Sequence, residues 1–492
     1  MKFLRRPDLD TLTRVEIAAQ AFLAQGVYGE MTRIANCYRV SRLFVYQLRW
    51  QLLLLYELKT CAADSPQAIK EYVDRHILLL RLEGRCSLAQ ISQIIRQLGL
   101  PYSSLGYISQ RLTAYARRLP AESLAGAQIQ FLLSDEIFTL GRPILITAEP
   151  RSLAILKIEL AEQRDAETWR KHWEQLVKAG VISHPIVVSD QGSGLIKGCG
   201  LLGLTHHPDL FHLLQGLAKF GERFYRQALA AIAREYERGE LEVGRSEGVI
   251  KRRGEAYEAA KAEAQAKIRR YDNFCYLWRE LLAALELFDR QGRLPELAAR
   301  QAEIAAILEL MGELGCEQLQ SELKSFAAAL ESYGGYYQRA EAVYRQLLER
   351  YPAAVVQALG LGWQLQRQAT NSKDSELKQR LKQAAEFYFG YAASLMPEQA
   401  KQYEALRQEV LEALEGEVRS SSLVENVNSA LRPLLETCRG QVGQELLDLF
   451  AYVHNRRRFV RGKRADRAPI ELLTGKKLEK TWLESLLELE VA

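Results

Sequence analysis

Residues 186–198 read IVVSDQGSGLIKG, an apolar run that ends in the single carboxylate of Asp190 and continues with three glycines in seven residues. The apolar run is typical of a buried strand, and the glycine-rich segment is typical of a strand-to-helix turn. A GxGxxxG turn can bind a dinucleotide pyrophosphate, but a carboxylate two residues before the first glycine would repel phosphate. We therefore favour a second interpretation, in which Asp190 is a ligand for a hard divalent cation and the small residues beside it leave room for a phosphodiester.

The segments around Asp190 predict a mixed sheet with helices packed on it. In chain order they are strands at 129–138, 143–150 and 153–160, a helix from 165, a strand at 184–190, a helix at 193–203, and a strand that runs into a helix at 204–220. Three meandering strands that are extended through a helical crossover give parallel and antiparallel neighbours in one sheet. From 220 to 416 strand signals vanish, and no convincing repeat period is present, which favours an irregular helical bundle over a solenoid.

Two helix-turn-helix patterns are predicted within residues 11–120. In the first, MTRIANCYRVSRLFVYQLRWQL, Ser41 is the expected N-cap of a second helix whose outward residues would face a major groove: Arg42, Tyr46 and Arg49. A glycine is usual in such a turn, and Arg39 stands there instead. In the second, CSLAQISQIIRQLGLPYSSLGYISQRL, a helix would carry Ile91, Ile94 and Leu98 on its inner face and end at Gly99. The alternative for either unit is a plain helical hairpin in a bundle.

Charge is distributed unevenly along the chain. Of 492 residues, 66 are Lys or Arg and 61 are Asp or Glu, but residues 1–120 hold 17 basic residues against 9 acidic ones, and residues 456–464 read RRRFVRGKR. Local basic surfaces of this kind indicate a polyanion that binds at particular places. No apolar run approaches the roughly 20 residues that cross a bilayer, and the scattered cysteines fit a reducing compartment, so we expect a soluble, cytoplasmic protein.

Partner carboxylates for Asp190 are expected at neighbouring element ends. Asp135, in FLLSDEIF, lies within the first strand of the same sheet, and Glu425, in SSLVENVNSALRPLL, lies on the first helix after the helical block. Two rivals are less suited to the site. Glu136 should point to the opposite face of the sheet from Asp135, and Glu149 falls at a hairpin turn.

In their order along the chain, VVSDQGSGL, PDLFH, VENVNSALR and AYVHNRRRF with APIELLTG resemble landmarks of the DDE transposases of bacterial insertion sequences. The resemblance covers roughly residues 129–218 and 420–476. It implies a mostly α chain with one α/β domain, in which an RNase H-like mixed sheet is interrupted by a large all-helical insertion and preceded by helix-turn-helix units. The domains would be 1–62 and 63–122 (helix-turn-helix), 123–219 (catalytic core, first part), 220–416 (insertion), 417–476 (core, second part) and 477–492 (C-terminal helix).

The resemblance also implies roles for individual residues. Asp135, Asp190 and Glu425 would hold two Mg²⁺ ions, with Mn²⁺ as a substitute, for cleavage of DNA at the element ends and transfer of the 3′-hydroxyl to target DNA. His212, in PDLFH, would contact the scissile phosphate, or Asp209 would merely cap a helix there. Arg432, two helical turns after Glu425, would hold a flanking phosphate.

The basic stretch would contact DNA or form a solvated face; its residues are Arg456, Arg457, Arg458, Arg461, Lys463 and Arg464. Trp278 would stack on an extruded base or belong to the core of the insertion.

The partners that the resemblance implies are double-stranded DNA, as terminal inverted repeats and target, and at least one further copy of the chain. The protein would work in a bacterial cytoplasm at the nucleoid, with no membrane. Two alternatives stay open. One is a non-catalytic DNA-binding regulator or domesticated transposase descendant, which would not need the carboxylates. The other is a helical interaction scaffold, which leaves the mixed sheet unexplained.

Overall fold

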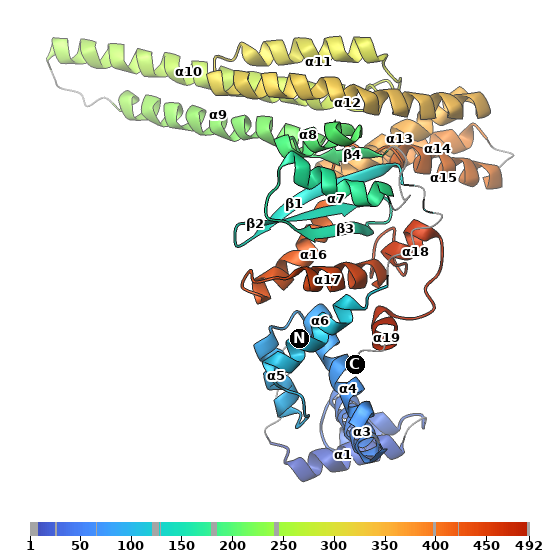
Figure 1. Cartoon of the computed structure of the whole chain (residues 1–492). Coiled ribbons are helices and arrows are strands. Elements are labelled where there is room, and N and C mark those ends of the chain that lie inside the picture. The colour runs from blue at the N-terminus through green and yellow to red at the C-terminus, as the bar shows by residue number, and fades with distance from the viewer. Residues whose placement is uncertain are drawn as a thin grey trace.

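The structure is a computed structural model that describes residues 8–24, 27–64, 66–120, 127, 129–178, 185–240, 246–396, 400–421 and 423–489. The chain is mostly helical with one small mixed sheet of five strands, as expected (Figure 1). None of the helices in these ranges combines the length and the apolar character that crossing a membrane would require.

The sheet contains the predicted elements in the predicted order. β1 (Phe131–Thr139), β2 (Arg142–Ala148) and β3 (Ile155–Leu160) form an antiparallel meander. After α7 (Ala166–Lys178), β4 (Ile186–Ser189) pairs parallel to β1, and after α8 (Ser193–Leu202), β5 (Thr205–Pro208) pairs parallel to β4. The spatial order is therefore β3-β2-β1-β4-β5, which makes β1 and β4 adjacent although the meander and α7 separate them in sequence.

Each face of the sheet is covered by different helices. α7 and α8 bury Trp169, Trp173 and Leu195 against one face. On the other face lie α16 (Val424–Thr437) and α17 (Gln444–Arg456), with Val427 and Leu431 of α16 packed on Leu133 and Val188 of the sheet. Residues from both ends of the helical insertion thus build one core.

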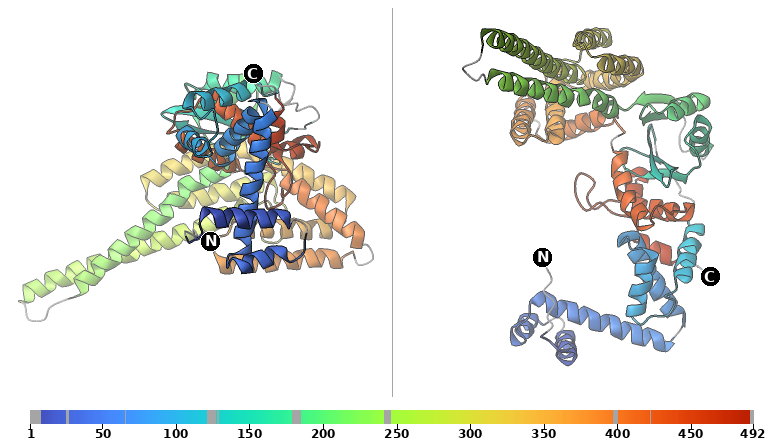
Figure 2. Two further views of the ribbon diagram at one scale, coloured as in Figure 1. Left: turned by 90° about the horizontal axis from the view of Figure 1, so that it is seen from below. Right: turned by 90° about the vertical axis from the view of Figure 1, so that its left-hand side faces the viewer.

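Helices α1 (Thr11–Leu23), α2 (Glu30–Cys37) and α3 (Arg42–Asp64) form a small unit of their own around Ile17, Ile34 and Val45. The turn between α2 and α3 contains Arg39 with φ of 51°, so a non-glycine residue adopts the left-handed conformation that glycine usually provides. Figure 2 shows this unit at the far end of the long α3, away from the sheet.

The second helical unit is joined to the body of the protein. It comprises α4 (Pro66–Leu78), the π-helical turn Leu79–Glu83, α5 (Leu88–Gln97) and α6 (Leu105–Arg117), and it shares a core with α17 and with α19 (Trp482–Leu487). The predicted inner face of α5 is partly wrong, because Ile95 is buried while Leu98 is half exposed. The domain boundary expected at 122 lies outside the described residues.

The insertion is an irregular bundle of α9 (Leu210–Gly239), α10 (Glu247–Ala284), α11 (Leu297–Gly312), α12 (Glu317–Arg350), α13 (Ala353–Asn371), α14 (Ser375–Ser394) and α15 (Ala400–Glu415). The distal parts of α9 and α10 project from it as a two-helix arm (Figures 1 and 2). A short helix, α18 (Pro469–Thr474), completes the chain between α17 and α19.

Candidate active site

Asp135 and Asp190 are neighbours because of the strand register. Leu133 on β1 pairs with Val188 on β4, which runs parallel to it. Asp135 and Asp190 each come two residues later in the chain and are therefore adjacent. Because side chains alternate between faces with a period of two, both carboxylates project to the face of Leu133 and Val188, which α16 covers. Glu136 lies on the opposite face, as predicted, and pairs there with Arg164.

The glycines after Asp190 allow helix α8 to pack closely against the start of α7, rather than leaving open space. A Cβ on Gly194 would lie 2.1 Å from the carbonyl oxygen of Arg164, and a Cβ on Gly198 would lie 2.9 Å from Cβ of Trp169. The N-terminus of α8 can therefore approach the start of α7 only because these residues are glycines. The expectation that the glycines leave room for a phosphodiester is corrected accordingly, although the amide of Gly192 does donate to Oδ1 of Asp190 (2.9 Å).

Glu425 comes to the same corner from the first turn of α16. The buried residues Val424, Val427 and Leu431 fix this helix on the sheet, and Glu425 stands beside them with its side chain half exposed. The pKa of Asp135 is raised to about 6, mainly by burial and also by the negative charges of Glu425 and Asp190, while hydrogen bonds from Glu136 N and Asn428 oppose the rise. The three predicted carboxylates therefore share one electrostatic environment.

Each of these carboxylates is held by a different donor. Asn428 donates to Asp135 (2.7 Å), the amide of Gly192 donates to Asp190, and Arg432 lies 3.4 Å from Glu425. Within the described ranges, no three His, Cys, Asp or Glu side chains are drawn together closely enough to hold a metal ion. The donor set nevertheless fits a hard divalent cation, because carboxylate oxygens from three elements face one partly buried corner whose negative charge a cation would neutralise.

Asp209 and His212 flank the site, and the predicted capping role of Asp209 is observed. Asp209 caps α9 by accepting from the amide of Phe211 (2.8 Å), and its other oxygen accepts from Nδ1 of His212 (2.7 Å) and Oγ of Ser421 (2.6 Å). The hydrogen bond that His212 donates to Asp209 raises the pKa of His212, and the charges of Asp135 and Asp190 contribute in the same direction. Asp209 thus orients an imidazole that is half exposed beside the carboxylates.

Glu149, the other rival carboxylate, has a structural role. It accepts from the amides of Arg151 (3.0 Å) and Ser152 (2.7 Å) and so closes the turn between β2 and β3, as expected for a hairpin residue.

Much of the basic stretch is engaged within the protein. Arg457 pairs with Glu83 (3.2 Å), Arg458 with Glu471 (2.6 Å) and Lys463 with Glu415. Arg464 donates to the carbonyls of Arg151 (2.7 Å) and Pro150 (3.0 Å). Arg456 stacks over the ring of Tyr452, whereas Arg461 is exposed. These contacts connect α17 with α18, the β2–β3 turn and the insertion. Four of the basic residues stay exposed nevertheless, so the segment is also a solvated basic face: Arg457, Arg458, Arg461 and Lys463.

In the first helix-turn-helix, α3 exposes two of its three predicted contact residues. Arg42 and Tyr46 are exposed, whereas Arg49 is half-buried. Four further residues, among those of α3 whose burial is described, are also exposed and were not selected from the sequence: Leu43, Gln47, Trp50 and Gln51.

Sequence reasoning missed Asn428 and Ser421. Asn428 is three residues after Glu425, a spacing that places both on one face of a helix, and this was the available signal. Nothing in the sequence near Ser421 indicated that it would bond Asp209, which precedes it by 212 residues.

No protein-family model matches the sequence, and no curated protein is similar enough to be counted as a relative. The arrangement of side chains alone must therefore support a function.

Proposed function

We propose that this chain is a DNA transposase of the DDE type, with an RNase H-like core that cleaves DNA at element ends and joins 3′-hydroxyls to target DNA. The observation that carries the proposal is the juxtaposition of Asp135 on β1 and Asp190 at the end of β4, with Glu425 on α16 near enough to raise the pKa of Asp135. The meander, the parallel addition of β4 and β5, and the return of α16 after a helical insertion support the same assignment.

The metal would be held by those three side chains. A bound Mg²⁺, with Mn²⁺ as a substitute, would supply Lewis-acid chemistry for the attacking water or DNA 3′-hydroxyl and for the departing 3′ oxygen. Asn428 holds the carboxylate of Asp135 in a fixed orientation, since it is buried and donates directly to Oδ2. The amide of Gly192 does the same for Asp190.

Two basic side chains beside the carboxylates suit the phosphates of the substrate. His212 is fixed at Nδ1 by Asp209, which leaves Nε2 as the ring nitrogen for a phosphate oxygen. Arg432 is exposed on α16 next to Glu425 and can hold a neighbouring phosphate. DNA ends would be read by α3, whose exposed residues lie on a helix that follows a turn, the geometry of a recognition helix.

The test is Mg²⁺-dependent cleavage of a duplex that carries the inverted repeats flanking the gene. Asp190→Ala and Glu425→Gln should reduce cleavage by about a thousandfold or more, because each removes a ligand from the reacting centre. Glu436→Gln, on the exposed side of the same helix as Glu425, should cut like the wild type. If all these proteins cut equally well, the site assignment fails.

The same experiment distinguishes the non-catalytic alternative. A protein that binds the duplex but never cuts it, with Mg²⁺ or Mn²⁺ and with or without the substitutions, would be a regulator or domesticated descendant.

A further inference from the structure

The arm built by α9 and α10 carries an apolar stripe that nothing in the described structure covers. The stripe consists of Tyr225, Leu229, Ile232 and Tyr236, whose exposed fractions are 43%, 47%, 41% and 70%. Their spacing of four, three and four residues keeps them within about 60° of one another around the helix axis. Such spacing is typical of a helix face that packs against another helix.

The stripe is distinct from the seam that holds the arm together. α9 packs on α10 through Phe224, Ala228 and Ala231, which are buried and lie roughly a quarter of a turn away from the stripe. Of the stripe, only Tyr225 also contacts α10, through the ring of Tyr271 (centroids 5.4 Å apart). Leu229, Ile232 and Tyr236 are exposed, and large exposed side chains at this spacing indicate an interaction surface.

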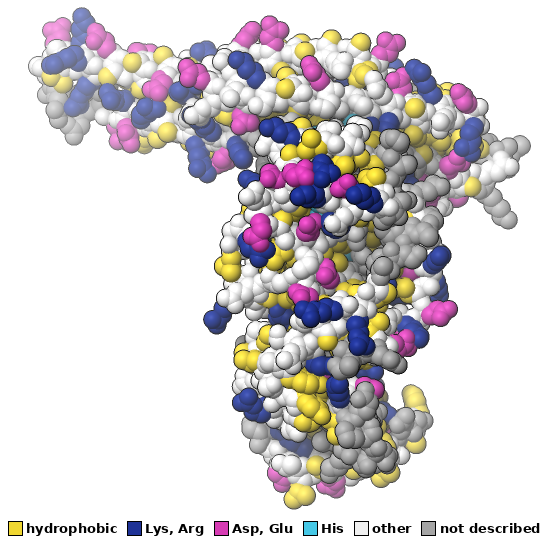
Figure 3. All heavy atoms as spheres, viewed as in Figure 1, with side chains coloured by type: hydrophobic (Ala, Val, Ile, Leu, Met, Phe, Trp, Pro, Cys, Tyr) yellow, Lys and Arg dark blue, Asp and Glu magenta, His cyan; other side chains and the backbone are white. Residues whose placement is uncertain are grey.

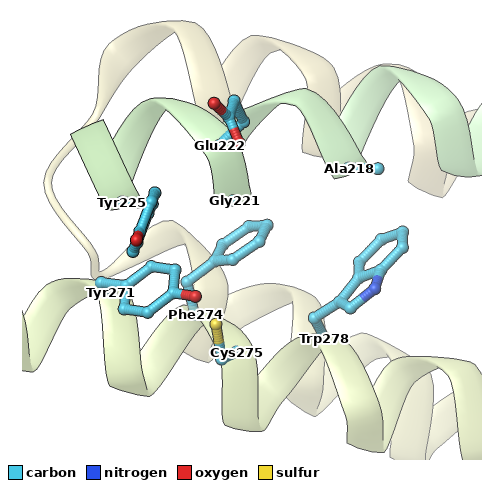
Figure 4. Close-up of a pocket in the computed structure, with 8 residues that line it drawn as sticks. All are labelled: Ala218, Gly221, Glu222, Tyr225, Tyr271, Phe274, Cys275 and Trp278. Carbon is cyan, nitrogen blue, oxygen red and sulfur yellow. The ribbon is translucent and has the colours of Figure 1, made fainter. Parts of the chain in front are cut away.

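A hollow lies on the same face of α9, nearer the body of the protein (Figure 4). Ala218 and Gly221 form its floor on α9, and Tyr271, Phe274, Cys275 and Trp278 line it from α10. Its volume is about 330 Å³, and Tyr225, the first residue of the stripe, lines its distal edge. Trp278 stacks on Phe274 with ring centroids 6.2 Å apart, so its ring is a wall of this hollow. Glu222 provides a carboxylate at the rim.

We propose that the arms of two copies of this chain pair antiparallel along this face, with Tyr236 of each copy in the Gly221 hollow of the other. In an antiparallel pair that places Tyr236 opposite Gly221, Ile232 lies opposite Tyr225 and Leu229 lies beside the twofold axis. The hollow suits tyrosine, because its walls are aromatic and Glu222 can accept from the phenol hydroxyl. This surface is independent of whether the chain cleaves DNA.

A second copy fits this face better than other occupants do. Protruding residues and a hollow on one face of one helix are the self-complementary arrangement that a twofold contact requires. The distal part of the arm also projects from the rest of the chain (Figure 2), which leaves its stripe accessible to a second arm.

The charges on the arm argue against DNA as the occupant. Basic and acidic side chains alternate along it (Figure 3), and Arg226 and Arg234 are paired with Glu222 (2.8 Å) and Glu263 (2.9 Å). A DNA-binding surface would instead carry a continuous basic face.

The oligomeric state of the full-length chain tests the proposal by sedimentation velocity over a concentration series. The wild type should be a dimer, and Leu229→Glu should raise the dissociation constant by roughly a hundredfold, because twofold symmetry buries the unpaired charge twice. Leu310→Glu on α11 is the matched control, since Leu310 is equally exposed (48%) but lies away from the stripe, and it should dimerise like the wild type.

Cross-linking provides a second, positive readout. Tyr236→Cys should form a disulfide-linked dimer with Cys275 of the partner under mild oxidation, and the double variant Tyr236→Cys with Cys275→Ser should not. A monomeric wild type, a dimer that survives Leu229→Glu, or cross-linking without Cys275 would each overturn the proposal. If Leu229→Glu weakens DNA binding without changing the mass, the arm binds DNA and the proposal is wrong.

Discussion

Asn428, which is fully buried on α16, donates from Nδ2 to Oδ2 of Asp135 on β1 across 2.7 Å. The bond joins residues 293 positions apart and ties the helix of Glu425 to the strand of Asp135. Among the described residues, Oδ1 of Asn428 is a buried oxygen without a hydrogen-bond partner. Asn428 is therefore placed for its effect on Asp135 rather than for a well-satisfied amide in the core.

Asn428→Ala should lower the rate of DNA cleavage by about 10- to 100-fold, the usual cost of losing a residue that orients a metal ligand. Asn426→Ala is the matched control, because Asn426 is exposed on the same helix two residues earlier. Both proteins should be compared by single-turnover cleavage and by urea unfolding, which separates loss of orientation from loss of fold. Equal cleavage rates for both variants would contradict the assigned role of Asn428.

Alanine substitutions of two glycines in α8, Gly194 and Gly200, should change the free energy of unfolding in opposite directions. Gly194→Ala should lower the free energy of unfolding by about 2 kcal/mol or more, because the added Cβ meets the backbone of Arg164. Gly200→Ala, where nothing lies within 4 Å of the added Cβ, should raise it by about 0.5–1 kcal/mol through helix propensity. Urea unfolding measures both changes, and a stable Gly194→Ala protein would show that α8 does not pack as described.

His172 should make the fold sensitive to acid. Its ring is fully buried between Thr147 (3.0 Å) and Glu159 (2.8 Å), and burial lowers its pKa to about 4 from an ordinary value of 6.5. The unfolded chain therefore gains a proton at a higher pH than the folded chain does. The difference in pKa corresponds to about 3 kcal/mol in the free energy of unfolding. This stability is present above pH 6.5 and is lost as the pH falls toward 4.

The measurement is urea unfolding between pH 7.5 and 4 for the wild type and His172→Gln. In this pH range, the slope of the free energy of unfolding against pH should be smaller for the variant by the equivalent of about one proton. A variant as acid-sensitive as the wild type would mean that His172 is already protonated in the fold.

Alanine substitutions of Arg464 and Arg461 should have different effects on stability and on DNA binding, although the two residues are only three positions apart in one basic stretch. Arg464→Ala should lower the free energy of unfolding by about 2 kcal/mol, because it leaves the carbonyls of Pro150 and Arg151 without their donor. Arg461→Ala should leave stability within about 0.5 kcal/mol and reduce the salt dependence of DNA affinity by about one unit of slope. Titrations of DNA binding against salt, beside urea unfolding, give both quantities.

The exposed face of α3 should determine affinity for DNA. Arg42→Ala should weaken binding to the duplex that carries the inverted repeats by about tenfold, as expected for loss of one contact in a groove. Arg290→Ala, in the insertion and paired with Glu280 (2.7 Å), should bind like the wild type. Fluorescence anisotropy at one fixed salt concentration measures the difference, and equal losses in both variants would indicate non-specific binding.

The sequence alone determined the elements around Asp190 and the residues that cap them. Ser41 and Asp209 each accept from a backbone amide at the start of a helix, as their positions predict. It also selected Asp135 and Asp190, because each follows an apolar run, and Glu425, because it lies on the first helix after the helical block. These features depend on residues no more than about four positions apart, which is the range of helix capping and of side-chain alternation.

Only the tertiary structure decided what those residues touch. The amide that holds Asp135, the serine that bonds Asp209, the packing of Gly194 on Arg164 and the engagement of Arg464 all join segments distant in sequence. The sequence cannot show them, because a charged or small residue looks the same whether it faces solvent, a ligand or another part of the chain. Which of these it faces is set by how the strands and helices pack, and that packing is the sum of many contacts rather than a property of any one segment.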